Sequence, residues 1–180
     1  METRPTGLGL RFPNVGPGPD PLSLVDLTAP VAPPDPTTVE APDPAHEAIV
    51  VLLHRDHHAG NCRRQVRAVA DRYDEFRERG TQVVSVVSEP RHRVREWQAR
   101  YDLPYPICAD PAAEAGEAFD QRVRHGTLGR TFDLLGRMPA AIVLDVRAPG
   151  DVAVLATHRG DSIWDRPRID ALLSDVAQRS

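Results

Sequence analysis

The chain lacks several features that would assign it to a common functional class. It has no lysine, and its 22 basic residues, all arginines, are dispersed among 26 acidic residues without a basic block. This dispersion, with a formal net charge of −4, does not indicate binding to nucleic acid or to an anionic membrane. No apolar run is long enough to cross a bilayer, and the first residues lack the apolar core of a secretory signal. We therefore expect a cytoplasmic protein.

Cysteine is also scarce, since Cys62 and Cys108 are the only two thiols in the sequence. Two cysteines are too few for the disulfide framework of small secreted proteins. In a reducing compartment, each cysteine is either a buried packing residue or a chemically reactive thiol. Cys108 lies in the apolar stretch 104–109 and is expected to be a buried strand residue. A role as partner thiol would require its α-carbon to lie within about 7 Å of that of Cys62. No sequence pattern predicts that proximity.

The N-terminal part of the sequence has little hydrophobic periodicity. Residues 1–45 are dense in proline, and we expect them to form an extended, largely irregular extension. Within it, the apolar residues of 21–27 either dock on the domain as a short edge strand or turn, or remain free, and the sequence leaves both alternatives open. The 41% hydrophobic content of the 180-residue chain is sufficient for a core. We assign residues 46–180 to one domain.

From residue 47 onward, the chain alternates the patterns of strands and helices. Apolar runs rich in β-branched residues predict buried strands at 48–53, 82–87 and 104–108. Helical spacing of apolar residues predicts helices from about Cys62 to Gly80, from Pro90 to Tyr101, after residue 111, and at the C-terminus around 169–176. Two further strands, at 140–146 and 152–157, are joined by a turn short enough for an antiparallel hairpin. This order predicts an α/β fold with a mixed sheet.

Cys62 lies where the first buried strand gives way to a helix. The first turn of a helix presents unpaired N–H groups and the positive end of the helix dipole, and both favour a thiolate over a thiol. The neighbouring guanidinium of Arg63 acts in the same direction. We therefore predict that Cys62 is a reactive thiol. The alternative is a small buried residue on the inner face of the helix.

Several segments together resemble the peroxiredoxin-like proteins of the alkyl hydroperoxide reductase and thiol-specific antioxidant superfamily. The resemblance runs from about residue 47 to residue 177, and it is carried by the strand and loop that lead to Cys62 and by the segments 83–89, 103–111 and 138–145. It implies a thioredoxin-like three-layer α/β/α sandwich with a mixed central sheet. It also implies a protein without a bound cofactor.

The resemblance assigns roles to individual residues. Cys62 matches the peroxidatic cysteine, which follows the first core strand at the start of a helix. Arg137 resembles the arginine that peroxiredoxins direct at the thiolate and the peroxide. Pro139 resembles the cis-proline that faces the thiol in thioredoxin-like folds.

Two positions depart from the usual peroxiredoxin pattern. Typical members carry a proline seven positions before the cysteine, and three positions before it a threonine or serine whose hydroxyl hydrogen-bonds the peroxide. Here these positions hold Arg55 and Ala59. The related peroxiredoxin-like 2 group has an arginine and a cysteine there, in a Cys-x-x-Cys motif followed by an arginine. Arg55, Cys62 and Arg63 fit that group, whereas Ala59 excludes a disulfide within the motif.

The resemblance implies a thiol-dependent redox protein that reduces peroxides through Cys62 alone. The resulting sulfenic acid would be reduced by an external thiol or a thioredoxin-type protein. Arg55, Arg63 and Arg137 are the expected thiolate-supporting residues. The competing interpretation is an inactive thioredoxin-fold module that binds a partner on the Pro139 side, and the alanine at position 59 favours it.

A third class, a metal-binding protein, would use His54, His57 and His58 with Cys62. Imidazole and thiolate are good ligands for zinc or copper, but this spacing matches no closed structural site. We therefore expect no metal. Oligomerisation is left open by the sequence.

Overall fold

The computed structural model describes residues 10–24, 27, 47–54, 60–115, 140–148, 151–159 and 166–178. Its main sheet has five strands in the order β5-β4-β3-β6-β7. The strands are β3 (Ala48–His54), β4 (Thr81–Val87), β5 (Ile107–Ala109), β6 (Ala140–Ala148) and β7 (Asp151–Arg159).

The sheet is mixed, as the sequence predicts. β3 pairs in parallel with β4, and β4 with β5, whereas β6 runs antiparallel to both β3 and β7. Every residue of β3 and β4 is buried, because these strands are covered on both faces of the sheet. The predicted hairpin of β6 and β7 is confirmed.

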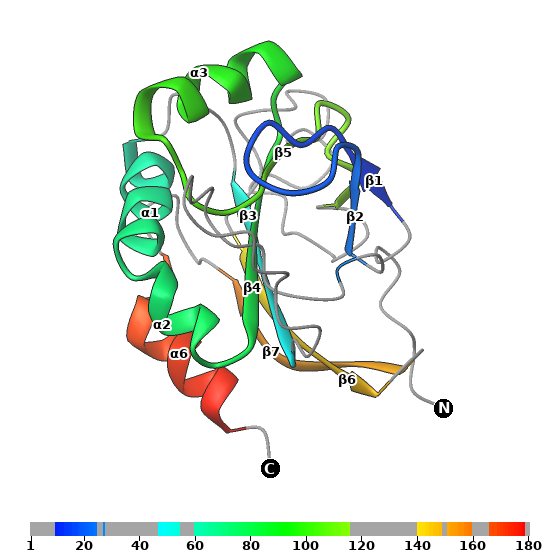
Figure 1. Cartoon of the computed structure of the whole chain (residues 1–180), viewed down its shortest axis with the longest axis vertical. Helices are drawn as coiled ribbons and strands as arrows, with labels where there is room; N and C mark the ends of the chain where they lie inside the picture. Colours follow the sequence, from blue (N-terminus) through cyan, green and yellow to red (C-terminus); the bar gives the residue numbers. More distant parts are fainter. Residues whose placement is uncertain are drawn as a thin grey trace, which may run out of the picture.

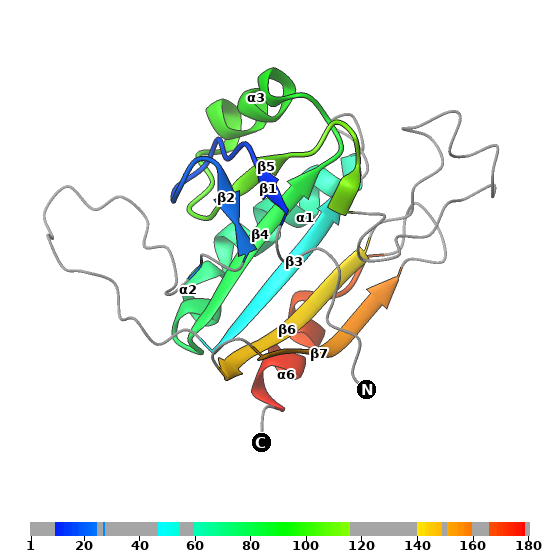
Figure 2. The same ribbon diagram turned by 90° about the vertical axis from the view of Figure 1, so that its right-hand side faces the viewer.

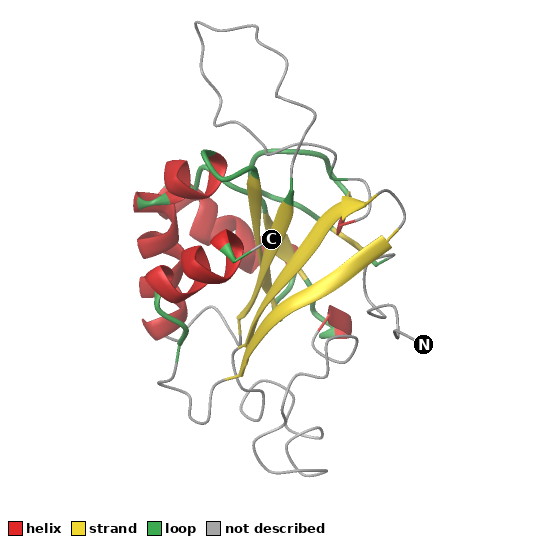
Figure 3. Cartoon of the chain, turned by 90° about the horizontal axis from the view of Figure 1, so that it is seen from below, coloured by secondary structure: helices red, strands yellow, loops and turns green. Residues whose placement is uncertain are grey.

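Four helices gather on one side of the sheet (Figures 1 and 3). They are α1 (Gly60–Asp71), α2 (Tyr73–Arg77), α3 (Arg91–Tyr101) and α6 (Ile169–Ala177). The sequence predicted one helix from about Cys62 to Gly80, but the chain breaks at Arg72, which has φ −120° and ψ 18°. Gly80 then turns the chain into β4 with φ 58°, a left-handed conformation that glycine adopts without strain.

Alternation along the strands divides the core into two clusters. Val50 and Leu52 of β3 face the helices and pack with residues of α1, α2, α3 and α6. Val51 and Leu53 point to the other face, where they pack with residues of the N-terminal segment. The sheet is therefore covered on both sides.

The N-terminal segment forms a small hairpin on that second face (Figure 2). β1 (Arg11–Phe12) pairs antiparallel with β2 (Leu22–Ser23). Four of its apolar side chains, Phe12, Leu22, Leu24 and Leu27, are at most 5% exposed. Burial of such a side chain stabilises a protein by about 1.5–3 kcal/mol, which is large beside a net stability of about 5–15 kcal/mol. The hairpin is therefore part of the folded unit.

The sequence left open whether residues 21–27 dock on the domain. They do so through Leu22, Leu24 and Leu27, but β2 pairs with β1 and not with the main sheet. The segment along the edge of the sheet lies earlier in the chain: the amide of Val15 donates to the carbonyl of Ile107 at 3.0 Å. Part of the expected irregular extension is thus ordered. A domain boundary at residue 45 stays a prediction, because residues 28–46 lie outside the described ranges.

Asn14 anchors this segment to β5. Its side-chain Oδ1 accepts hydrogen bonds from the amides of Gly16 and Ile107, and its Nδ2 donates to the carbonyls of Pro17 and Pro19. Gly16 allows the close approach, since a Cβ there would lie 2.7 Å from the carbonyl oxygen of Tyr105.

None of the helices in the described ranges has the length and apolar character that a membrane crossing requires.

Candidate functional site

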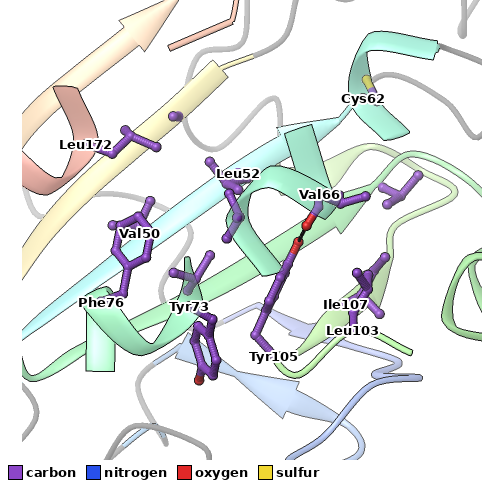
Figure 4. Packing of buried hydrophobic residues seen from close by; sticks show 14 of the residues in the cluster. Val50, Leu52, Cys62, Val66, Tyr73, Phe76, Leu103, Tyr105, Ile107 and Leu172 are labelled. Carbon is purple, nitrogen blue, oxygen red and sulfur yellow. Dashed lines mark hydrogen bonds between the residues drawn. The ribbon is translucent and has the colours of Figure 1, made fainter. Parts of the chain in front are cut away.

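Cys62 lies in the first turn of α1, close to the carboxyl-terminal end of β3. Figure 4 shows it at one end of the cluster that fills the space between α1 and the sheet. Its side chain is fully buried, and it packs in the same cluster as Leu52 of β3 and Val66 of α1. The predicted position, at the junction between a buried strand and a helix, is confirmed.

Within the described part of the chain, Arg166 is the cation that contacts the sulfur. Its Nη2 donates a hydrogen bond to Cys62 Sγ at 2.9 Å. Arg166 is half-buried and precedes α6, which packs on the same face of the sheet as α1. A guanidinium only donates hydrogen bonds, so the sulfur is the acceptor, a role in which a thiolate is far stronger than a thiol. The dipole of α1 adds positive potential at the same atom.

The predicted supporting residues have different positions. Arg63 is half-buried, and its Nη2 would lie 3.9 Å from a Cβ placed on Gly60, at the start of α1. The guanidinium hydrogen-bonded to the sulfur is therefore that of Arg166 and not that of its sequence neighbour. Arg55, Ala59, Arg137 and Pro139 lie outside the described residues, so their roles stay predictions.

Buried polar side chains make hydrogen bonds on the helix-covered face of the sheet. His54 ends β3, and its Nε2 is 3.0 Å from Ser85 Oγ on the neighbouring strand β4. The hydroxyl of Tyr105, also buried, donates at 2.9 Å to the carbonyl of Val66 in α1. Figure 4 shows the last of these bonds. These contacts tie the end of β3 to β4, and Tyr105 to the helix that carries Cys62.

His54 is neutral in this environment. Burial, together with the positive charge of Arg166, lowers the pKa of His54 to about 3. Its ring packs edge-on against Trp97, with centroids 6.0 Å apart. A protonated imidazole would lose its hydration and face a guanidinium, so the uncharged form is retained.

Cys108 lies on the opposite face of the sheet from Cys62. It packs with the N-terminal hairpin, whereas Cys62 packs with the helices. Burial raises the pKa of the Cys108 thiol, and the nearby carboxylates of Asp20 and Asp110 act in the same direction. Both cysteines are free thiols. The expectation that Cys108 is a buried strand residue is confirmed.

No group of three or more potential metal ligands occurs within the described part of the chain. His54 Nε2 is engaged by Ser85. His57 and His58 lie outside the described ranges, so the full set of candidate ligands is not placed.

Sequence reasoning missed both Arg166 and the His54–Ser85 pair. Arg166 is separated from Cys62 by 104 positions and lies outside any periodic pattern, so no sequence signal distinguishes it from other arginines. The pair did leave a signal. His54 and Ser85 are polar residues in buried apolar runs, and a buried polar side chain requires a hydrogen-bond partner.

Comparison with known proteins agrees with this architecture. The model of the AhpC/TSA family matches residues 24–148, more than half of the chain. The structure of peroxiredoxin Q from Xanthomonas campestris superposes with a TM-score of 0.72 at 15% identity, covering 99% of this chain and 96% of that one. Peroxidoxin BcpB from Mycobacterium tuberculosis gives a TM-score of 0.69 at 17% identity, with coverage of 95% and 94%.

AhpC from Enterococcus faecalis covers 73% of each chain, with a TM-score of 0.59 at 14% identity. At these identities, the solved structures establish the fold, which is thioredoxin-like. No curated protein sequence matches the chain. The family match and the fold together show that the chain belongs to the AhpC/TSA family and is a peroxiredoxin-like, thiol-dependent redox protein.

Proposed function

We propose that the protein reduces peroxides through Cys62, with Arg166 as the cation that supports the thiolate. The observation that carries this proposal is the 2.9 Å hydrogen bond from Arg166 Nη2 to Cys62 Sγ at the start of α1. Arg55, Arg63 and Arg137 are further candidates for the same supporting role.

The chemistry needs one thiol from this chain and two from outside it. The Cys62 thiolate attacks one peroxide oxygen, the O–O bond breaks, and the second oxygen leaves with the electron pair and takes a proton from water. Cys62 is then a sulfenic acid. A first external thiol converts it to a mixed disulfide with release of water, and a second external thiol restores the Cys62 thiol. Low-molecular-weight thiols and thioredoxin-type proteins are both suitable reductants, and the reducing cytoplasm is the compartment we propose.

The contact with Arg166 favours this function over that of an inactive binding module. A cysteine that only fills space is satisfied by apolar neighbours. Placing a guanidinium against it in a partly buried site costs hydration energy that a neutral sulfur recovers poorly. A thiolate recovers it by a charge-assisted hydrogen bond.

The test compares the wild-type chain with Cys62→Ser. Each is mixed with hydrogen peroxide or cumene hydroperoxide, peroxide loss is followed with dithiothreitol as reductant, and sulfenic acid is trapped with dimedone and located by mass spectrometry. We expect the wild-type chain to consume both peroxides and to carry the adduct on Cys62. A wild-type chain that consumes peroxide no faster than Cys62→Ser contradicts the proposal and leaves the binding module.

Replacing the second cysteine should have little effect. Cys108 is buried on the other face of the sheet, so we expect Cys108→Ser to retain peroxide turnover within about twofold, since distant sites act independently. The measurement is turnover with dithiothreitol, with a thermal melt to correct for any loss of folded protein. A chain that forms a Cys62–Cys108 disulfide on oxidation, seen by non-reducing mass spectrometry, would contradict the one-cysteine cycle.

A further inference from the structure

The fold gathers arginines that the sequence disperses. Helices α1 and α3 together carry seven of the 22 basic residues of the chain and only two acidic residues, although the net charge of the whole chain is −4. The two helices are neighbours (Figure 1), and Arg67 Cζ in α1 lies 5.7 Å from the centroid of the Tyr101 ring at the end of α3. We define the arginine face as the arginines of α1 and the arginine next to Tyr101, which are Arg63, Arg64, Arg67 and Arg100.

The arginine face has little counter-charge of its own. Arg64, Arg67 and Arg100 are exposed, and none of them forms an ion pair within the described residues. Arg91, nearer the start of α3, is paired by contrast with Asp20 of the N-terminal segment. A negative partner for the arginine face must therefore come from outside the described part of the chain.

The charges of the arginine face oppose the stability of α1. Arg63 and Arg64 lie four and three positions before Arg67, and like charges at these spacings destabilise a helix. The first turn of α1 also contains no acidic residue, so a cation there is unfavourable beside the positive end of the helix dipole. An anionic surface that covered the arginines would relieve both effects. The arrangement therefore suits binding better than folding.

The arginine face adjoins the reactive thiol. It covers the outer side of the helix whose inner side holds Cys62. Hydrogen peroxide is uncharged, so a positive surface does not steer it, whereas such a surface speeds the encounter with an acidic protein by about 10–10³-fold. Arginine is also enriched in protein–protein interfaces. We propose that the arginine face is the docking surface for the protein that reduces Cys62, a dithiol protein with acidic residues around its reactive thiol.

This inference rests on the proposed peroxide reaction, which leaves Cys62 as a sulfenic acid. Because Cys62 is fully buried, the start of α1 opens locally before a protein thiol reaches it. The partner's first thiol attacks the sulfenic sulfur, the S–O bond breaks, and the hydroxide that leaves takes the proton of that thiol and becomes water. The partner's second thiol then attacks the partner's own sulfur in the mixed disulfide. Cys62 leaves as a thiolate, and the partner is oxidised to a disulfide.

The first test is the salt dependence of the reduction step. The Cys62 sulfenic acid is formed with one equivalent of hydrogen peroxide and reduced with either a thioredoxin-type protein of net negative charge or uncharged dithiothreitol. Dimedone added at successive times measures the sulfenic acid that remains. Because salt screens the attraction between the two surfaces, we expect the rate with the protein to fall about tenfold between about 20 mM and about 300 mM NaCl. The rate with dithiothreitol should change less than about twofold.

Charge reversal tests the location of the docking surface. At about 100 mM NaCl, where charges act over about 10 Å, we expect Arg64→Glu/Arg67→Glu to react with the protein reductant about fivefold more slowly than the wild-type chain. Its rate with dithiothreitol should stay within about twofold of the wild-type rate. Arg64→Lys/Arg67→Lys keeps both charges and should react with the protein reductant at the wild-type rate.

The matched control is Arg77→Glu/Arg79→Glu, which changes the net charge by the same amount. These two residues precede β4, which runs parallel to β3 in register from its first residue, so they lie at the end of the sheet opposite to Cys62. We expect this variant to react with the protein reductant within about twofold of the wild-type rate. A thermal melt verifies that each variant is folded, and the single variant Arg64→Glu replaces a double variant that is not.

Three results would overturn the proposal. The first is a reduction by the acidic protein that depends neither on salt nor on the arginine face. The second is an equal loss of rate in the variant and in its matched control. The third is an arginine face that is needed only for sedimentation with phosphatidylserine vesicles, which would assign it to a membrane. A wild-type chain that forms no sulfenic acid would overturn the peroxidase function and the docking surface together, whereas the three results above leave the peroxidase function intact.

Discussion

Arg166→Ala is expected to slow the reaction of Cys62 with hydrogen peroxide about 100-fold. A hydrogen bond to a charged group is worth about 1.5–3 kcal/mol, and a preorganised donor that meets negative charge in the transition state contributes about 10²–10³ in rate. The guanidinium of Arg166 donates to Cys62 Sγ, and from this position we expect it also to donate to the oxygen that leaves with the electron pair. The measurement is the second-order rate of sulfenic acid formation by rapid mixing and dimedone trapping.

Arg168→Ala is the matched control. Arg168 lies two residues further along the same segment and is exposed, so its removal should change the rate by less than about twofold, as surface substitutions usually do. Alkylation by iodoacetamide should fall less than the peroxide reaction in Arg166→Ala, since alkylation produces no oxyanion. Equal peroxide rates in Arg166→Ala and Arg168→Ala would show that the contact with the sulfur has no catalytic role.

Acid should destabilise the wild-type chain more than His54→Gln. In the folded chain, the pKa of His54 is about 3, against 6.5 for a free histidine. Above pH 6.5, neither state binds the proton, and the contribution of the neutral imidazole to stability is complete. Below pH 6.5, the unfolded chain binds a proton that the folded chain does not bind. The free energy of unfolding therefore falls by about 1.4 kcal/mol per pH unit until the pH reaches the pKa of His54 in the folded chain.

From this slope, we expect the free energy of unfolding of the wild-type chain to fall by about 2–3 kcal/mol more than that of His54→Gln between pH 7.5 and pH 4.5. Urea unfolding of both chains at the two pH values measures the difference. His92→Gln is the control, since His92 is exposed on α3 and its replacement should leave the acid slope of the wild type intact. A wild-type chain with the same acid slope as His54→Gln would mean that the buried imidazole titrates near its ordinary pKa.

Much of the fold could be predicted from the sequence, because its determinants are local. Continuous apolar runs identified β3 and β4, and the short turn after β6 identified the terminal hairpin. Cys62 was placed correctly because a strand followed by helical periodicity fixes the junction between them. The break at Arg72 was missed, since the apolar positions of α1 and α2 continue the same spacing across it.

The features that were not predicted depend on contacts between distant parts of the chain. Nothing in the composition of residues 10–24 reveals that Asn14 satisfies an amide of β5, or that Leu22 is fully buried against the sheet. Arg55, Arg63 and Arg137 were expected to support the thiolate, but among the described residues the guanidinium at the sulfur belongs to Arg166, in the segment before α6. Helical spacing predicts which residues of a single helix lie side by side. Which charged side chain meets the sulfur depends instead on how two elements pack against each other.

Because the sheet separates the two thiols, labelling of Cys108 would report when the second face of the sheet becomes exposed. In the function that we propose, Cys62 reacts with small electrophiles while the chain is folded, whereas Cys108 becomes accessible when the N-terminal hairpin leaves the second face of the sheet. Timed labelling of native protein, followed by mass spectrometry of each cysteine, would therefore record site chemistry and hairpin release as separate signals. The population of the open state, and its response to oxidation of Cys62, would be readable from one untagged sample.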